Sequence, residues 1–413
     1  MFGNGGGSAA RANDSFMTSS LLTLYVLIVL VQPVYSPNMD AKALSSAVAE
    51  FSAKFCNELS KSTSVVSSPL SAEFVLALLA LGTTDPAHSE LLKTLGIPGD
   101  DDIRSSFSAV SSNLKSIKGV TLNVANKVYI KEGGYDLNED LKIDAVKIFD
   151  AALEKIDFGN SVNAAKLIND WVEGKTNGKI KDLISKDSLD DDTRLVLLNA
   201  IYFKGTWKKK FQPEHTTDQP FYIDEENTVD VPMMYKEDDY VYGESQALNA
   251  QLLQIPYVGD EASMLIVLPN EITGLDAILQ KLASGHNLLS ELDKMHKTKV
   301  QVTIPKFKIE TEIDLMEVLP KLGISAIFDS NNSGVTKVLN TDENLYVSKA
   351  VQKAFIEVNE EGAEAAAATV MSIACYSMVI GEPEVPRFIA DRPFLAAIVA
   401  HDTLYFMATH RGK

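Results

Sequence analysis

Apolar side chains recur at helical spacing in the first part of the chain. Between residues 44 and 59 they are four, three, four and four positions apart, which places them on one face of a helix. These residues are Leu44, Val48, Phe51, Phe55 and Leu59. The run at 65–71 predicts a short buried strand that ends at Pro69. A second helix through Leu79 is expected next, with Ser71 as its N-cap.

Short apolar runs rich in β-branched or aromatic residues predict strands, most of them in the second half of the chain. Three such runs lie at 122–130, 196–203 and 264–268. Apolar and polar residues alternate from 300 to 309, so we expect one half-buried strand with a kink at Pro305. The apolar runs 394–399 and 404–408 flank a polar turn and predict a buried hairpin. This order of elements indicates the α+β class.

The chain after residue 36 shows no repeat and no linker rich in Pro, Gly or Ser, so we expect a single domain over residues 37–413. Residues 1–36 have the pattern of a secretory signal region. The apolar run 21–31 is shorter than the roughly 20 residues of a membrane span, and Ser36 suits cleavage. Met17 is a candidate start. The expected protein is secreted and extracellular; the alternatives are an uncleaved anchor and a cytoplasmic protein with an unusual leader.

The composition, with 46% hydrophobic and 23% charged residues among 413, is that of a globular protein. A net charge of −18 repels phosphate backbones, so nucleic acid is excluded as a partner, and no membrane partner is expected. The charge also disfavours a polyanion cofactor, although the lysines at 208–210 form a local basic patch. We expect no cofactor.

The chain lacks the usual signatures of an enzyme or a metal centre. Its six histidines include no H-E-x-x-H arrangement and none in metal-ligand spacing with a cysteine. No G-x-S-x-G elbow, P-loop or G-x-G-x-x-G occurs. Two cysteines do not make a disulfide framework; Cys56 lies beside the first helix face and is expected to be an inert, packed thiol. The sequence therefore predicts neither an enzyme nor a metal protein.

Five motifs carry a resemblance to one family. In chain order they are Ser-Pro-Leu-Ser at 68–71, Asn-Asp-Trp-Val and Thr-Asn-Gly-Lys-Ile within 169–180, Asn-Ala-Ile-Tyr-Phe-Lys-Gly-Thr-Trp closed by Phe211 at 199–211, the small-residue segment 360–369, and Arg-Pro-Phe at 392–394. Over residues 40–410 the chain resembles the serpins. The resemblance implies a fold of about nine helices around three sheets, with an exposed reactive loop at about 360–386.

The resemblance also implies a one-use trap for serine proteases. The protease forms an acyl-enzyme with the loop, and the cleaved loop then inserts into the central sheet, which holds the protease in a covalent 1:1 complex with a monomer. The residues that the resemblance places in the sheet-opening region are Ser68, Ser71, Asn199, Trp207 and Gln352. Gln352 stands where many members have a histidine.

The hinge of the expected loop is Glu360, Glu361 and Gly362, followed by small side chains. Because side chains of a strand alternate between its faces, one face carries no charge: Ala363, Ala365, Ala367, Thr369, Met371 and Ile373. The other face begins with Glu364, Ala366 and Ala368. Alanine also favours helices, so an Ala-rich helix is the alternative, but no helical stripe continues through 373–380. We interpret the segment as an inserting strand.

The resemblance places the scissile bond fourteen residues after Gly362, at Tyr376–Ser377. An aromatic residue suits the apolar pocket of chymotrypsin-like enzymes, and no Lys or Arg occurs between 353 and 387. Met378 is the alternative bait residue, since 377–388 is a few residues longer than in other members. Cys375 is expected to be a free, exposed thiol.

Two functions follow from this sequence. The first is suicide inhibition of a chymotrypsin-like serine protease. The alternative is a non-inhibitory carrier or storage protein of the same fold, in which charged, bulky or proline residues on the inserting face would be tolerated. Asn331, in Asn-Asn-Ser, begins the only N-x-S/T sequon of residues 37–413 and is the expected glycosylation site of a secreted protein.

Overall fold

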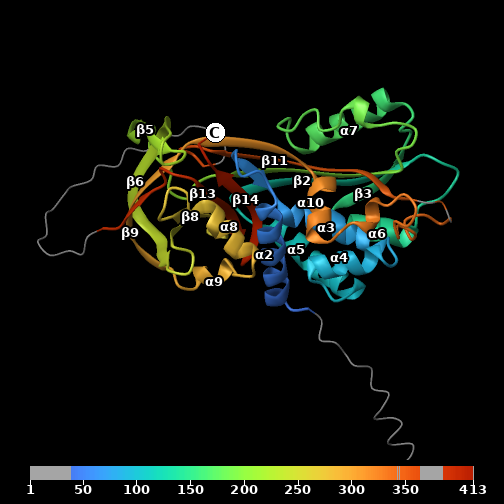
Figure 1. Ribbon diagram of the computed structural model, residues 1–413, viewed down its shortest axis with the longest axis horizontal. Coiled ribbons are helices and arrows are strands. Elements are labelled where there is room, and N and C mark those ends of the chain that lie inside the picture. Colours follow the sequence, from blue (N-terminus) through green and yellow to red (C-terminus); the bar gives the residue numbers. More distant parts are fainter. Residues whose placement is uncertain (1–38, 342, 344, 363–384, 413) are drawn as a thin grey trace, which may run out of the picture. The chain divides into compact units, whose positions relative to one another are not determined.

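The computed structural model describes residues 39–341, 343, 345–362 and 385–412, which form nine α-helices and fourteen strands (Figure 1). The predicted α+β class and the predicted number of helices are confirmed. The helices are α2 (Ala41–Asn57), α3 (Pro69–Leu81), α4 (Ala87–Leu95), α5 (Asp100–Ser116), α6 (Glu139–Lys147), α7 (Ser161–Lys175), α8 (Leu275–Ala283), α9 (Leu289–Leu292) and α10 (Leu315–Leu322). None of them is long and apolar enough to cross a membrane.

The strands fall into two hydrogen-bonded sheets. The first five strands in the chain are β1 (Val65–Ser67), β2 (Val120–Lys131), β3 (Ala151–Ile156), β4 (Leu195–Gly205) and β5 (Thr216–Tyr222). The next five are β6 (Thr228–Ser245), β7 (Ala250–Pro256), β8 (Ala262–Pro269), β9 (His296–Pro305) and β10 (Phe307–Asp314). The last four are β11 (Val347–Val358), β12 (Arg387–Ile389), β13 (Phe394–Ala400) and β14 (Thr403–His410).

The five-stranded sheet has the order β10-β11-β4-β2-β3. Its centre is the parallel pair β4 and β11, in which Asn199 lies opposite Gln352. The helix α7 covers one face of this sheet and α3 lies on the other (Figure 1). The side chains of β4 alternate accordingly: Leu198 packs in the cluster under α7, whereas Leu197 packs in the main core. We call the junction of β4 and β11 the seam.

The nine-stranded sheet has the order β1-β14-β13-β8-β7-β6-β9-β12, with β5 paired to β6. The 18-residue β6 pairs with β5 near its start, with β7 near its end, and with β9 between. Because β6 is continuous, the three expected sheets occur as two hydrogen-bonded networks. A second apolar cluster joins α2 and α8 to this sheet through residues such as Ala53, Leu279 and Leu252.

One capping prediction is wrong. Ser68, and not Ser71, is the N-cap of α3, because the Ser68 hydroxyl accepts a hydrogen bond from the Ser71 amide (3.3 Å). Pro69 then occupies the first helical position, where its missing N–H has no helical partner to lose. Pro69, two residues after the end of β1, therefore begins the next helix, and the buried Ser71 lies in its first turn.

The expected single strand at 300–309 is two strands in different sheets. β9 ends at Pro305 in the nine-stranded sheet, and β10 begins at Phe307 in the five-stranded sheet. Between them the Lys306 amide donates to the Pro232 carbonyl of β6 (2.8 Å), while Phe307 already pairs with Val358 of β11. The alternation of apolar residues continues across this change of partner, so the pattern alone does not reveal it.

The predicted burial of Cys56 is confirmed. The thiol lies on α2 in the second apolar cluster, 3.4 Å from the Ser67 hydroxyl, and burial raises its pKa to about 12. A thiol of this pKa carries almost no thiolate at neutral pH and is therefore unreactive. Cys56 is free. Cys375 lies outside the described residues, so its exposure stays a prediction.

His410, the last residue of β14, is buried in a cage of aromatic side chains. Its ring stacks on Phe307 at a centroid distance of 4.9 Å and contacts Phe221 and Phe394 at 5.0 and 5.2 Å. Both ring nitrogens are buried without a hydrogen-bond partner among the described residues. Burial lowers the pKa of His410 to about 4, because the cage solvates the imidazolium poorly.

This cage predicts a pH dependence of stability. Since the folded pKa lies below the unfolded value of about 6.5, the contribution of His410 is present above pH 6.5 and is lost as the pH falls toward 4. Between pH 7 and pH 5 the wild type should lose about 2 kcal/mol more unfolding free energy than His410→Phe. Urea unfolding at both pH values measures this. The exposed His296→Phe is the control and should behave as wild type; equal losses in all three proteins would contradict the prediction.

Candidate functional site

The sequence-predicted residues Ser68, Ser71, Asn199 and Gln352 meet beneath the seam in one buried polar cluster. The Gln352 side chain accepts from the Ser68 amide (3.0 Å) and donates to the Ser68 carbonyl (2.9 Å). It also donates to Asn199 Oδ1 (2.6 Å), and Asn199 Nδ2 donates to the Ser71 carbonyl (3.2 Å). The cluster therefore ties β11, β4 and the start of α3 together.

Asn126 of β2 is a further member of this polar cluster that the sequence did not indicate. Its Oδ1 accepts from Asn199 Nδ2 (2.5 Å) and from the Ser71 hydroxyl (3.5 Å). Asn126 is 2% exposed, like Asn199 at 1%. The one available signal was a polar residue inside the apolar run 122–130, where an unpaired amide would be costly to bury.

Trp207 and the predicted hinge residues 360–362 lie together at the end of β11. The Trp207 amide donates to the Glu361 carbonyl (2.9 Å), and its indole N–H donates to the Asn359 carbonyl (2.9 Å). The Phe211 amide donates to the Glu360 carbonyl (2.9 Å). The backbone from Asn359 to Glu361 is therefore fixed to the chain that follows β4.

Gly362 ends this anchored stretch in a conformation that requires glycine. It has a φ of +129° and pairs with both Thr206 and Asn359. A Cβ at this position would stand 2.7 Å from the Trp207 amide nitrogen and clash with the Gly205 carbonyl. Only glycine therefore fits this position, because any side chain would strike the neighbouring backbone and strain φ.

Glu360 is held by two partners beside the hinge. Lys306 forms an ion pair with its Oε2 (2.9 Å), and the Thr216 hydroxyl donates to its Oε1 (2.8 Å). Burial alone would raise the pKa of Glu360, but these bonds outweigh it and lower the pKa below its ordinary value. Glu360, the first residue of the predicted hinge, is thus held in place as a charged side chain.

A family model described as Serpin (serine protease inhibitor) matches residues 46–411. The chain belongs to the serpin family. Antichymotrypsin-2 of Bombyx mori is 46% identical to it over 348 residues, covering 84% of this chain and 92% of that protein. Antitrypsin of Bombyx mori is 45% identical over 359 residues, covering 86% and 91%.

The crystal structure of Serpin48, described as a highly specific serpin in the insect Tenebrio molitor, has the same fold. It matches with a TM-score of 0.81 and 33% identity, covering 91% of this serpin and 99% of that chain. The two Bombyx relatives are named for different target enzymes at almost equal identity. Similarity therefore identifies the family but does not choose between these targets.

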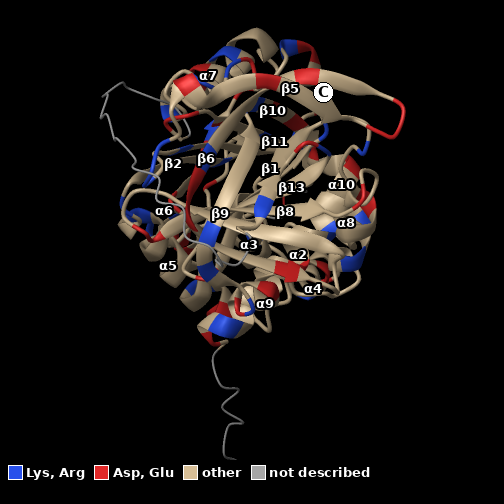
Figure 2. Ribbon diagram, turned by 90° about the vertical axis from the view of Figure 1, so that its left-hand side faces the viewer, with Lys and Arg blue, Asp and Glu red and all other residues tan. Residues whose placement is uncertain are grey.

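The basic patch at 208–210 is neutralised in this serpin. Lys208 pairs with Asp260, Lys209 with Asp238, and Lys210 with Glu361. Basic and acidic residues also lie close together on β9 and β6 (Figure 2). One such pair is Lys299 with Glu237. These three lysines therefore do not present unpaired charge to a polyanion.

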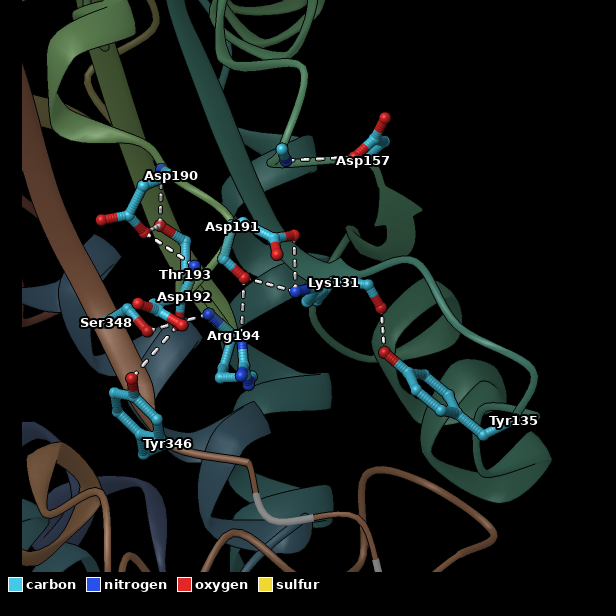
Figure 3. A network of polar contacts seen from close by, with 11 residues as sticks. Lys131, Tyr135, Asp157, Asp190, Asp191, Asp192, Thr193, Arg194, Tyr346 and Ser348 are labelled. Atoms are coloured by element: carbon cyan, nitrogen blue, oxygen red, sulfur yellow. Dashed lines mark hydrogen bonds and ion pairs between the residues drawn. The ribbon is translucent and has the colours of Figure 1, made fainter.

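At the end of the seam where β4 and β11 begin, the connection from α7 to β4 makes several polar contacts (Figure 3). The Tyr346 hydroxyl donates to the Asp192 carbonyl (3.2 Å), and the Arg194 amide donates to the Ser348 hydroxyl (2.9 Å). On the other side of β4, the Lys131 ammonium pairs with Asp191 (2.9 Å) and holds the pKa of that carboxyl below its ordinary value. The start of β4 is thus linked to both neighbouring strands.

Several predicted site residues of this serpin lie outside the described residues. These are Ala363, Glu364, Ala365, Ala366, Ala367, Ala368, Thr369, Tyr376, Ser377 and Met378. Asn331 is described: its side chain is exposed, and its amide donates to Asp329 Oδ1 (2.8 Å). The structure thus gathers Ser68, Ser71, Asn199 and Gln352 in one cluster and places Trp207 beside Asn359 and Glu361. The roles of all the predicted site residues stay predictions.

Proposed function

We propose that this serpin is a suicide inhibitor of a chymotrypsin-like serine protease. It acts as a monomer, without a cofactor, and forms a covalent 1:1 complex in which Tyr376–Ser377 is the cleaved bond. The observation that carries the proposal is the anchored Gly362 at the entrance of a parallel seam. A chain that leaves this glycine can return between β4 and β11 as an antiparallel strand with two neighbours.

The register of that strand follows from the pairs that Gly362 already makes. Gly362 is antiparallel to Thr206 and to Asn359, so each later residue would lie one step further back along both strands. Seven steps place Thr369 between Asn199 and Gln352, two residues that are themselves opposite in the seam. The two pairings agree, so one register fits both strands.

This register supports the proposed inserting face. Odd-numbered residues of β4, such as Leu197 and Ile201, point into the main core, and inserted residues opposite them would do the same. In the proposed register these inserted residues would be Ala363, Ala365, Ala367, Thr369, Met371 and Ile373. Glu364 would point to the opposite face beside Lys204, which avoids burying a carboxylate in the core.

The chemistry needs no catalytic group from this serpin. The protease serine oxygen adds to the Tyr376 carbonyl carbon, the Tyr376–Ser377 amide bond breaks, and the Ser377 nitrogen takes a proton from the protease histidine. An ester then joins Tyr376 to the protease. Insertion of the upstream strand pulls this ester from its aligned position before water hydrolyses it, which leaves the protease trapped.

A gel experiment tests this function. Incubation with chymotrypsin should give a complex that survives denaturation, because an ester joins the two chains. Mass spectrometry of the released C-terminal peptide should show a fragment that begins at Ser377. A fragment that begins at Val379 would instead identify Met378 as the bait. Complete cleavage without any complex would favour the carrier or storage protein.

We further propose that residues 1–36 are a secretory signal region, that 37–413 form the mature domain, and that Asn331 carries a glycan. Exposure of the Asn331 side chain supports the last point. Intact mass of the secreted protein before and after glycosidase treatment should differ by the mass of one N-glycan. The Asn331→Gln variant should show no difference. An untreated wild-type mass equal to that of the bare polypeptide would reject the glycan.

A further inference from the structure

A cavity of about 270 Å³ opens between α3, α5 and β2. Its apolar lining comes from residues of all three elements and from the segment after α6: Leu70, Phe74, Leu114, Leu122, Val124 and Phe149. Since engineered apolar cavities of about 150 Å³ bind benzene, this space is large enough for a molecule of about ten non-hydrogen atoms.

The inner end of the cavity is polar and includes a donor without a partner. Asn126 lines the cavity and is 2% exposed. Its Oδ1 is engaged by Asn199 and Ser71, whereas its Nδ2 has no hydrogen-bond partner among the described residues. A buried amide N–H without a partner is unfavourable, so an acceptor atom of an occupant would be stabilised there.

The open end of the cavity is marked by its charged lining residues, Lys115, Asp150 and Lys175. The side chains of Lys115 and Asp150 are 61% and 72% exposed and form an ion pair of 3.2 Å, and Lys175 is also exposed. All three charged groups are therefore at the solvent-exposed entrance. The rest of the lining consists of apolar side chains, amides and hydroxyls, so the interior offers no charged group to an occupant.

We propose that this cavity binds a small neutral molecule with an apolar body and one hydrogen-bond acceptor, such as a ketone or an ester. The apolar body packs against Leu70, Phe74 and Phe149, and the acceptor oxygen receives the Asn126 Nδ2–H bond. The site is separate from the proposed reactive loop, and binding does not depend on protease inhibition.

Two matched probes test the site on the full-length protein. 4-Phenyl-2-butanone carries the acceptor, and n-butylbenzene has a similar apolar body without it. Isothermal titration calorimetry should show saturable 1:1 binding of the ketone, with at least about tenfold weaker binding of the hydrocarbon, because a good hydrogen bond contributes about that factor. The ketone should also raise the melting temperature, since it binds the folded state.

Variants of the cavity wall complete the test. Leu114→Trp fills the cavity and should abolish ketone binding; Ser111→Leu, on the same helix and also lining the cavity, serves if the first variant does not fold. Leu167→Trp on the exposed face of α7 is the control and should bind as wild type. No saturable binding to wild type, undiminished binding to a filled variant, or equal affinity for both probes would each overturn the proposal.

Discussion

Cleavage of one peptide bond between residues 374 and 384 is expected to raise the melting temperature of this serpin by at least about 10 °C. Insertion would add about ten strand residues, each contributing roughly 1 kcal/mol through new hydrogen bonds, which together approach the stability of an ordinary domain. For a chain of this size such a gain corresponds to a shift of that order. A thermal melt of nicked and intact protein measures it.

The inserted register supplies a matched pair of variants for this experiment. Ala365→Arg would place a guanidinium between Phe203 and Ile356, both buried in the main core, so the nicked variant should melt no higher than the intact one. Chymotrypsin should cleave it as a substrate without forming the stable complex. Glu364→Arg carries the same charge on the opposite face and should retain both the shift and the complex.

Two outcomes would count against the inhibitor. Nicked wild type that melts no higher than intact protein would show that the cleaved loop does not enter the sheet. A stable complex formed by Ala365→Arg would show that trapping does not need the proposed face. In the first case the carrier or storage function takes the place of inhibition, because the fold itself does not require insertion.

Replacing Tyr376 with arginine is expected to exchange the target class. The second-order rate constant for chymotrypsin should fall by a factor on the order of 10³, because the apolar pocket must then desolvate a cation, and trypsin should become inhibited instead. Progress curves with a chromogenic substrate measure both constants. Met378→Arg is the matched control: if Tyr376 is the bait, chymotrypsin inhibition should change by less than tenfold.

The converse pattern would reassign the bait. If Met378→Arg creates the trypsin inhibitor and Tyr376→Arg does not, the scissile bond is Met378–Val379. The inserting strand would be unaffected by this change, because residues 363–373 lie upstream of both bonds and in the proposed register would span the seam down to Leu195. Thermal melts of the nicked protein and arginine substitution at the bait therefore test insertion and specificity separately.

The sequence by itself determined the elements whose partners are close in the chain. The apolar face of 44–59 lies within α2, and the hairpin at 394–408 appears as β13 and β14 joined by His401 and Asp402, which both adopt positive φ in a tight turn. These features depend on local periodicity and turn geometry, which a linear pattern records. The motifs likewise identified the family, since they are read from the chain alone.

Only the tertiary structure decided the features that depend on distant partners. Ser68 and Gln352 are 284 positions apart, yet they exchange two hydrogen bonds, and Asn126 joins them only because β2 lies beside β4. Likewise, Pro305 separates two strands because neighbouring residues pair with Pro232 and Val358 in different sheets. Hydrogen bonds between strands carry no signal in local periodicity, so the polar cluster, the register at Gly362 and the cavity beside Asn126 appear only when the sheets are assembled.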